Sequence, residues 1–339
     1  MEKKERIEYI DLAKGICILM VVAVHVAPEI AGLTWFTSFR MPLYFCLSGM
    51  FFKQYGGFSS FLIKKTDKLL IPFLGWYLIS YLIYYIRVLA IGEPEIQFHI
   101  SDIFYDKDFY NLPLWFLLSL FWCNIIYCII ASISSSRITQ GILVLCFASL
   151  GWVLSYSGLI NFLFVGTSLT CLPFFYMGQL IVSTSFVKNK YAKRDSIISG
   201  ICVALAIVCL TVPKETIHVL FFKNTIISGN PVMVYILAAS LVVLLLNICK
   251  YIGKIPYVSF LGRYSIIVLV THGLINNIIN RSVRHLIGDP SQEAAFHILL
   301  FVIIIGSMSL VIPFCKKFLG YITAQKNLIE EKFYSLSYQ

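Results

Sequence analysis

Apolar runs separated by short polar or charged segments recur along the whole chain. Most of these runs are close to the about 20 residues that an α-helix needs to cross a hydrocarbon core of about 30 Å. The pattern predicts ten membrane helices, at 16–30, 39–52, 69–91, 112–133, 138–156, 162–182, 197–212, 232–248, 258–279 and 294–314.

The second apolar run, 39–52, is shorter than the others and contains Pro42 and Gly49. Proline removes a backbone donor inside a helix, and glycine weakens helix formation. We expect this helix to be broken, tilted or extended into the loop that follows it.

Composition supports a membrane protein. Of the 339 residues, 59% are hydrophobic and only 13% are charged, whereas soluble domains carry about 25% charged residues. A water-soluble fold of this size could not bury so much apolar surface. We therefore predict an all-α, polytopic transmembrane bundle. It forms one domain over residues 1–339, with tails at 1–10 and 316–339.

The basic residues predict the orientation of this bundle. With ten spans, 20 of the 27 Lys and Arg residues fall on the side of the two termini and 7 on the other side. The positive-inside rule then places both termini in the cytoplasm. The net charge of +10 does not indicate nucleic-acid binding, because the basic residues form short clusters beside apolar spans, where anionic lipid headgroups lie.

The ten cysteines indicate packing rather than metal or disulfide chemistry. They contain no CxxC pair, and nearly all lie inside apolar runs. A zinc site or a disulfide framework needs clustered spacings. We expect small buried apolar side chains and no metal site.

His25 is the strongest candidate for chemistry, because an ionisable group inside a span is costly. It follows Lys14 by eleven residues. Eleven helical steps return to within about 20° of the same face, about 16 Å further along the axis. Glu29, four residues beyond His25, continues this stripe and could orient the imidazole. The alternative is a structural hydrogen bond from His25 to a neighbouring helix.

Other charged residues have two interpretations each. Arg40 is an interfacial anchor or faces a cavity near His25, and His272 is a satisfied core histidine or a catalytic group. Lys64, Lys65 and Lys68 follow the positive-inside rule or bind a phosphate-rich ligand.

Five segments carry a resemblance to a known family. They are IDLAKGICILMVVAVH (10–25), FRMPLYFCLSGMFF (39–52), LWFLLSLF (114–121), PFFYMGQLI (173–181) and FLGRYSIIVLVTH (260–272). In this order and spacing the chain resembles membrane acyltransferase family 3, and within it the branch of fucose 4-O-acetylases and related acetyltransferases. Lys14 and His25 match the family's basic-x10-His motif. Many members have Arg at the position of Lys14 and His at the position of Arg40.

The resemblance implies a membrane enzyme of the bacterial cytoplasmic membrane that uses acetyl-CoA or another acyl-CoA. The acceptor it implies is a carbohydrate, in a surface polysaccharide or related glycan. Acyl-CoA phosphates would lie at the cytoplasmic mouth near Lys14, with Lys64, Lys65, Lys68 or Arg263. His25 would act as general base or as transient nucleophile, with Glu29, Arg40 and His272 as further candidates.

Two other functions share the many spans and the intramembrane charges. One is a transporter or flippase of lipid-linked sugars, which often has repeated halves with interrupted helices. No such repeat is visible in this sequence. The other is a sensor or structural membrane protein in which His25 belongs to the core.

Overall fold

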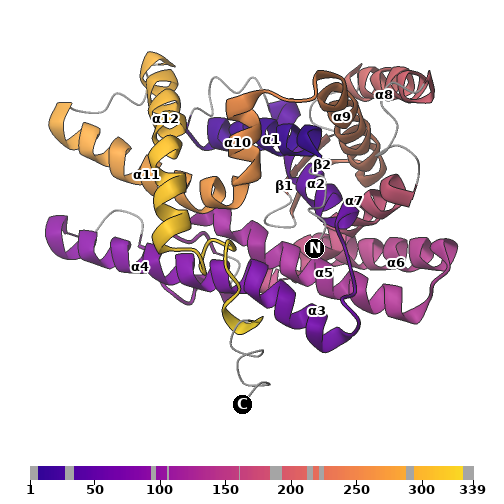
Figure 1. The fold of residues 1–339 in the computed structure, drawn as a ribbon, viewed down its shortest axis with the longest axis horizontal. Coiled ribbons are helices and arrows are strands. Elements are labelled where there is room, and N and C mark those ends of the chain that lie inside the picture. The colour runs from indigo at the N-terminus through magenta and orange to yellow at the C-terminus, as the bar shows by residue number, and fades with distance from the viewer. Residues whose placement is uncertain are drawn as a thin grey trace. The chain divides into compact units, whose positions relative to one another are not determined.

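The computed structural model of the protein describes residues 7–26, 34–92, 97–104, 107–159, 161–183, 193–211, 217–220, 225–287 and 294–330. Helices dominate this part of the chain (Figure 1). The α-helices are α1 Glu8–Val26, α2 Thr34–Met50, α3 Phe58–Lys65, α4 Ile71–Ile91, α5 Trp115–Ile133, α6 Arg137–Tyr156, α7 Val165–Ser183, α8 Lys193–Thr211, α9 Pro231–Ile252, α10 Pro256–Arg263, α11 Ser265–Ile287 and α12 Ala294–Phe318.

Shorter elements complete the described fold. A π-helical turn, η1 Thr66–Leu70, joins α3 to α4. Three 3₁₀ turns are η2 Asp102–Phe104, η3 Leu112–Leu114 and η4 Phe162–Phe164. Two strands, β1 Ile217–Leu220 and β2 Thr225–Gly229, form a two-stranded sheet that the sequence pattern did not predict. The prediction of a helical, polytopic fold is confirmed.

Every predicted span overlaps a helix or a pair of helices in the described residues, although α1 begins at Glu8, well before the predicted start at residue 16. Within the described residues, seven helical segments are long and apolar enough to cross a membrane, and the α10–α11 pair brings the number to eight if it counts as one span. With 17 residues, α2 is shorter than a full crossing. It is one helix through Pro42 that ends at Met50, so the expected break or extension is absent.

Large apolar side chains lie on outward faces, as lipid-facing helices require. Leu89 on α4 is 87% exposed, and Ile138 on α6 and Leu310 on α12 are each 78% exposed. In water such surface would be unfavourable by about 1.5–3 kcal/mol for each side chain. In a bilayer it contacts acyl chains, which are equally apolar.

The chain folds into two compact units, each built from separated segments. The first unit comprises Met1–Met50, Gly178–Val219 and Ile227–Ser309, and the second comprises Phe51–Met177, Leu220–Ile226 and Leu310–Gln339. Neither unit is one continuous stretch of sequence.

Helix α1 is the central helix of the first unit. It contacts α2, α9, α10 and α11, and side chains such as Leu12, Cys17 and Val22 are fully buried among them. Buried apolar side chains on more than one face of α1 suit this central position. Glycine permits a close approach elsewhere in the unit, since a Cβ at Gly178 would lie 2.0 Å from the Cys46 carbonyl oxygen. Gly178 therefore lets α7 approach α2 closely.

The predicted span at 258–279 is not one straight helix. It divides into α10 and α11, which are bent by 88° at Tyr264 (Figure 1). The bend follows from tight packing of α10 on α1. A Cβ at Gly262 would lie 1.8 Å from the Asp11 carbonyl oxygen, and one at Gly15 would lie 1.9 Å from that of Val258. Hydrophobic pattern alone cannot report such backbone contacts.

The second unit carries a docked segment after α12. The buried carboxylate of Asp67, on the π-helical turn, accepts hydrogen bonds from the backbone N–H groups of Leu328, Ile329 and Glu330 at 2.9–3.0 Å. These donors open a helical turn that begins at residue 328, so Asp67 serves as its N-terminal anion. Part of the predicted 316–339 tail is therefore packed against the bundle.

Candidate functional site

Two imidazole rings meet inside the first unit. His25 lies in the last turn of α1 and His272 in the middle of α11, with ring centroids 5.3 Å apart and planes tilted by 50°. His272 is completely buried, whereas the His25 side chain is exposed. A substrate can therefore reach His25 directly, whereas His272 is enclosed by protein.

Local hydrogen bonding determines the tautomer of His272. Its Nδ1 lies 2.9 Å from the Val268 carbonyl oxygen, one helical turn back. A carbonyl can only accept, so Nδ1 carries the proton and Nε2 carries a lone pair when the ring is neutral. That Nε2 is buried and has no hydrogen-bond partner within the described structure. The satisfied-core interpretation of His272 therefore accounts for only one of its two nitrogens.

Arg40 of α2 joins the same cluster. Its Nη1 donates to the Met20 carbonyl oxygen at 3.4 Å, and its own carbonyl accepts a hydrogen bond from the Cys17 thiol at 3.0 Å. Its buried Nε has no partner among the described residues. The guanidinium is close enough to both imidazoles for electrostatic interaction. Arg40 thus faces the histidine cluster rather than acting only as an interfacial anchor.

Asn276 and Asn280 also belong to this region, and sequence reasoning missed them. Asn276 Nδ2 donates to the His25 carbonyl oxygen at 3.3 Å. The side-chain oxygens of both asparagines are buried without a partner in the described part of the chain. Their signal in the sequence is the spacing of four from His272 to Asn276 and again to Asn280, which selects one helical face.

Lys14 and His25 lie on one unbroken helix, α1, so their spacing along a common stripe has the expected helical geometry. Lys14 is half-buried, and its carbonyl oxygen accepts a hydrogen bond from the Tyr44 hydroxyl at 3.1 Å. Hydrogen bonds therefore join α1 to α2 at Lys14 as well as at Arg40. Glu29, the proposed orienting carboxylate, lies outside the described residues.

Arg263 closes the elbow between α10 and α11 against α1. Its guanidinium lies 3.7 Å from a Glu8 carboxylate oxygen and 3.6 Å from one of Asp11, and Lys254 pairs with Glu8 at 3.3 Å. Two carboxylates already offset its charge, so a phosphate would have to compete with them. Helix positioning is the role that these contacts establish for Arg263.

The three lysines predicted as a phosphate site belong to the second unit. Lys64 pairs with Glu330 at 3.0 Å, and Lys68 donates to the Ala324 carbonyl oxygen at 2.7 Å. The Lys65 ammonium lies 5.6 Å from the centre of the Phe61 ring. Two of the three therefore hold the segment after α12, and donor binding by this group stays a prediction.

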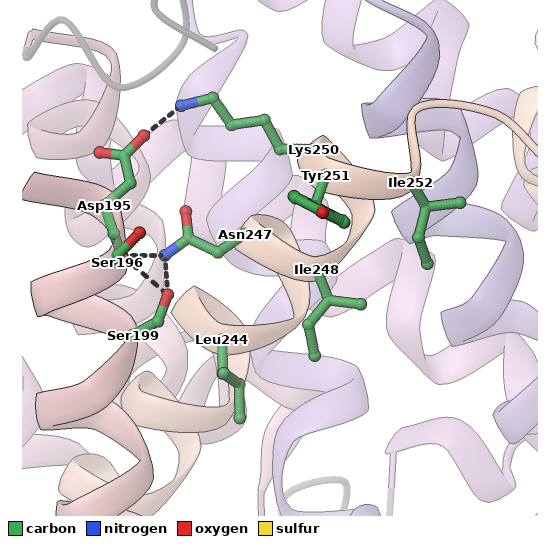
Figure 2. Close-up of a pocket in the computed structure, with 9 residues that line it drawn as sticks. All are labelled: Asp195, Ser196, Ser199, Leu244, Asn247, Ile248, Lys250, Tyr251 and Ile252. Carbon is green, nitrogen blue, oxygen red and sulfur yellow. Dashed lines mark hydrogen bonds and ion pairs between the residues drawn. The ribbon is translucent and has the colours of Figure 1, made fainter. Parts of the chain in front are cut away.

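A separate cavity of about 560 Å³ lies between α8 and α9 of the first unit (Figure 2). Its polar end is a buried ion pair, with Lys250 Nζ 2.5 Å from the Asp195 carboxylate. Asn247 donates to the Asp195 carbonyl and to the Ser199 hydroxyl (Figure 2). Ile248, Tyr251 and Leu244 supply apolar walls. Among the described residues that line this cavity, none is a histidine.

Sequence reasoning missed this buried pair, because a lysine such as Lys250 at the end of an apolar span is explained by the positive-inside rule alone. Within the described ranges, no group of three or more His, Cys, Asp or Glu residues is placed to hold a metal ion.

Helices that are long and apolar enough to cross a membrane define an integral membrane protein. The model of acyltransferase family 3, described as an acyltransferase domain, matches residues 7–316. The chain belongs to this family and is a membrane acyltransferase. Comparisons with curated proteins and with solved structures returned no match.

Proposed function

We propose that this protein transfers an acyl group, most simply acetyl, from cytoplasmic acyl-CoA to a hydroxyl of a surface polysaccharide or related glycan. The observation that carries the proposal is the accessible His25 imidazole at 5.3 Å from the enclosed His272, with Arg40 close to both. A membrane enzyme that activates a hydroxyl needs a base of this type at a reachable position.

In the proposed reaction, a neutral His25 nitrogen takes the proton of the acceptor hydroxyl. The oxygen attacks the thioester carbonyl carbon and forms the new C–O bond. The tetrahedral intermediate then breaks its C–S bond, and the CoA sulfur leaves with the proton that His25 held. Arg40, whose Nε is buried without a described partner, can donate to the oxyanion of the intermediate.

A nucleophilic role for His25 is the competing mechanism. The imidazole would then attack the thioester first and carry the acyl group as an acyl-imidazole. Rapid-quench analysis of the protein with radiolabelled acetyl-CoA and no acceptor distinguishes the two. Stoichiometric label on the protein that disappears on adding acceptor supports the nucleophile, and its absence supports the general base.

The donor route in this proposal follows the stripe of α1. The phosphates of acyl-CoA bind at the cytoplasmic end near Lys14, and the pantetheine arm extends toward His25, about 16 Å along the helix. Lys64, Lys65 and Lys68 are further candidates for donor binding, and so is Arg263 if its carboxylate partners release it. The acyl group then crosses the membrane without the whole cofactor.

The finer assignments rest on the resemblance. They are acetyl-CoA as donor, a carbohydrate acceptor of the fucose 4-O-acetylase type, and the bacterial cytoplasmic membrane as location. Binding of membrane lipid follows from the exposed apolar surfaces.

The test is His25→Ala in purified, reconstituted protein. Loss of general acid–base assistance lowers the rate by about 10²–10⁴, so acyl transfer falls to background while expression and membrane insertion remain. The matched control is His99→Ala, which alters an exposed histidine in the loop before α5 and leaves transfer unchanged. Near-normal transfer by well-inserted His25→Ala protein would remove His25 from the mechanism.

A further inference from the structure

Three hydrogen-bond acceptors without partners lie in a row on α11. They are His272 Nε2, Asn276 Oδ1 and Asn280 Oδ1, all buried and all unpaired within the described structure. Buried polar atoms in proteins are nearly always hydrogen-bonded, and in a membrane each exception is costly. Three exceptions on a single helix indicate a surface that is completed by a ligand.

Helical geometry places the three groups on one side of α11. Residues 272, 276 and 280 differ by four positions, so each advances about 6 Å along the axis and about 40° around it. The row is therefore about 12 Å long. Asn277 lies about 100° around the helix axis from Asn276 and about 60° from Asn280, and its side-chain oxygen is not among the buried unpaired atoms of the described residues.

The orientation of the Asn276 amide follows from its one bond. Its Nδ2 donates to the His25 carbonyl oxygen. Rotating the amide by 180° would bring two acceptor oxygens together, so Oδ1 is the free atom. The proton on His272 Nδ1 likewise leaves Nε2 as an acceptor. The row begins beside the two imidazoles and presents lone pairs along its length.

The chemistry of the row selects its ligand. Phosphates and carboxylates would be repelled by amide oxygens, and an acyl chain would leave the acceptors unpaired. Cations are disfavoured by the nearby Arg40 guanidinium. Hydroxyl groups can both donate and accept, and a series of them spaced over about 12 Å can satisfy all three acceptors.

We infer that His272, Asn276 and Asn280 form the binding site for a polyhydroxylated acceptor and direct one of its hydroxyls to His25. This inference rests on the proposed function for the direction of transfer. Asn276 and Asn280 are half-buried as residues. Because the terminal torsion of asparagine is broad, small rotations bring their amides to an entering hydroxyl. Residues of α11 thus select the acceptor, and His25 of α1 removes its proton.

Kinetics with two acceptors test the row. Reconstituted protein is supplied with acetyl-CoA and either methyl β-D-galactopyranoside, which has several hydroxyls, or 1-propanol, which has one. Asn276→Ala and Asn280→Ala each lower kcat/KM for the glycoside about three- to tenfold through KM, the effect of one hydrogen bond. Transfer to 1-propanol, which has no second hydroxyl to pair with the row, falls by a smaller factor than transfer to the glycoside in both variants. Asn277→Ala, the matched control, changes neither reaction.

A purely structural role for the asparagines gives a different pattern. It lowers transfer to both acceptors in parallel, and that result would overturn the inference. Unchanged glycoside kinetics in both Asn variants would overturn it as well.

Binding without chemistry separates the inference from the proposed function. Saturation-transfer NMR on His25→Ala protein in micelles, with the glycoside as ligand, detects contact when transfer is absent. The signal is retained in His25→Ala and lost when Asn276→Ala and Asn280→Ala are added. In one outcome, wild-type protein acylates neither acceptor while the Asn276→Ala and Asn280→Ala substitutions still abolish the NMR signal of the glycoside. That result would contradict the proposed acyl transfer and support the hydroxyl-binding site. An undiminished signal in the triple variant overturns the site.

Discussion

Histidine, arginine and asparagine side chains from three helices form the chemical centre of the first unit. Each makes one hydrogen bond to a backbone carbonyl and leaves another polar atom unpaired: Arg40 to Met20, His272 to Val268, and Asn276 to His25. These backbone bonds hold the groups in place. Such preorganisation is what stabilises a developing charge in an enzyme.

Lys14 is the residue whose proposed role is most open to test. If it binds a donor phosphate, its charge matters more than its shape. Lys14→Ala then raises KM for acetyl-CoA about ten- to a hundredfold, as expected for loss of a charged hydrogen bond of about 1.5–3 kcal/mol. Lys14→Arg retains much of the activity. Donor titration on reconstituted protein, normalised to the inserted amount, provides the measurement.

A role for Lys14 as a headgroup anchor makes the opposite forecast. Insertion or abundance would then fall in Lys14→Ala, with an unaltered KM in the protein that does insert. An unaltered KM would also redirect the donor route to Lys64, Lys65 and Lys68.

At the scale of elements, contact between α1 and α10 determines where α11 begins. Two glycines, Gly15 and Gly262, let the backbones touch, and Arg263 pairs with Glu8 and Asp11 across the same contact. The 88° bend that follows directs α11 so that His272 reaches His25. We therefore expect the geometry of the His25–His272 pair to depend on a packing contact near the other end of α1.

Gly262→Ala tests this dependence. Its Cβ would lie 1.8 Å from the Asp11 carbonyl oxygen, so the helices must separate, at a cost of about 1–3 kcal/mol or more. We expect a lower melting temperature in detergent and reduced transfer even below that temperature. Differential scanning fluorimetry and the acetyl-CoA assay measure the two effects.

Gly306→Ala on α12 is the matched control, because nothing lies within 4 Å of its Cβ. Alanine favours a helix over glycine by about 1 kcal/mol, so this variant is neutral or slightly stabilised. Equal behaviour of the two variants would contradict a structural role for the α1–α10 contact.

Over the whole molecule, membrane orientation links the site to its substrates. Both termini are predicted to be cytoplasmic, from the distribution of Lys and Arg. Lys14 would then lie toward the donor side and His25 toward the acceptor side.

Cysteine labelling provides the measurement of orientation. In intact cells, a membrane-impermeant maleimide should leave Lys3→Cys and Lys332→Cys unlabelled until the cells are permeabilised. The parent protein is the necessary control, because Cys146 on α6 is exposed. Labelling of either terminal variant in intact cells, above the parent, would contradict the ten-span orientation.

Much of the architecture was readable from the chain itself. The predicted runs at 112–133 and 162–182 coincide with helical segments Leu112–Ile133 and Phe162–Ser183 to within one residue. This agreement is expected because a helix in lipid must be apolar along its whole length and must satisfy its own backbone. The Lys14–His25 stripe was equally accessible, since it needs only the periodicity of one helix.

Sequence by itself determined the class of protein, the positions of the helices and His25 as the leading candidate. Tertiary structure alone decided that His272 and Arg40 join His25, that Asn276 and Asn280 extend this cluster, and that Arg263 pairs with carboxylates. The reason is physical. Hydrophobic length and periodicity are local properties, whereas the packing of α1 against α10 and α11 depends on contacts between residues more than 200 positions apart in sequence, such as the backbone contact of Gly15 with Val258.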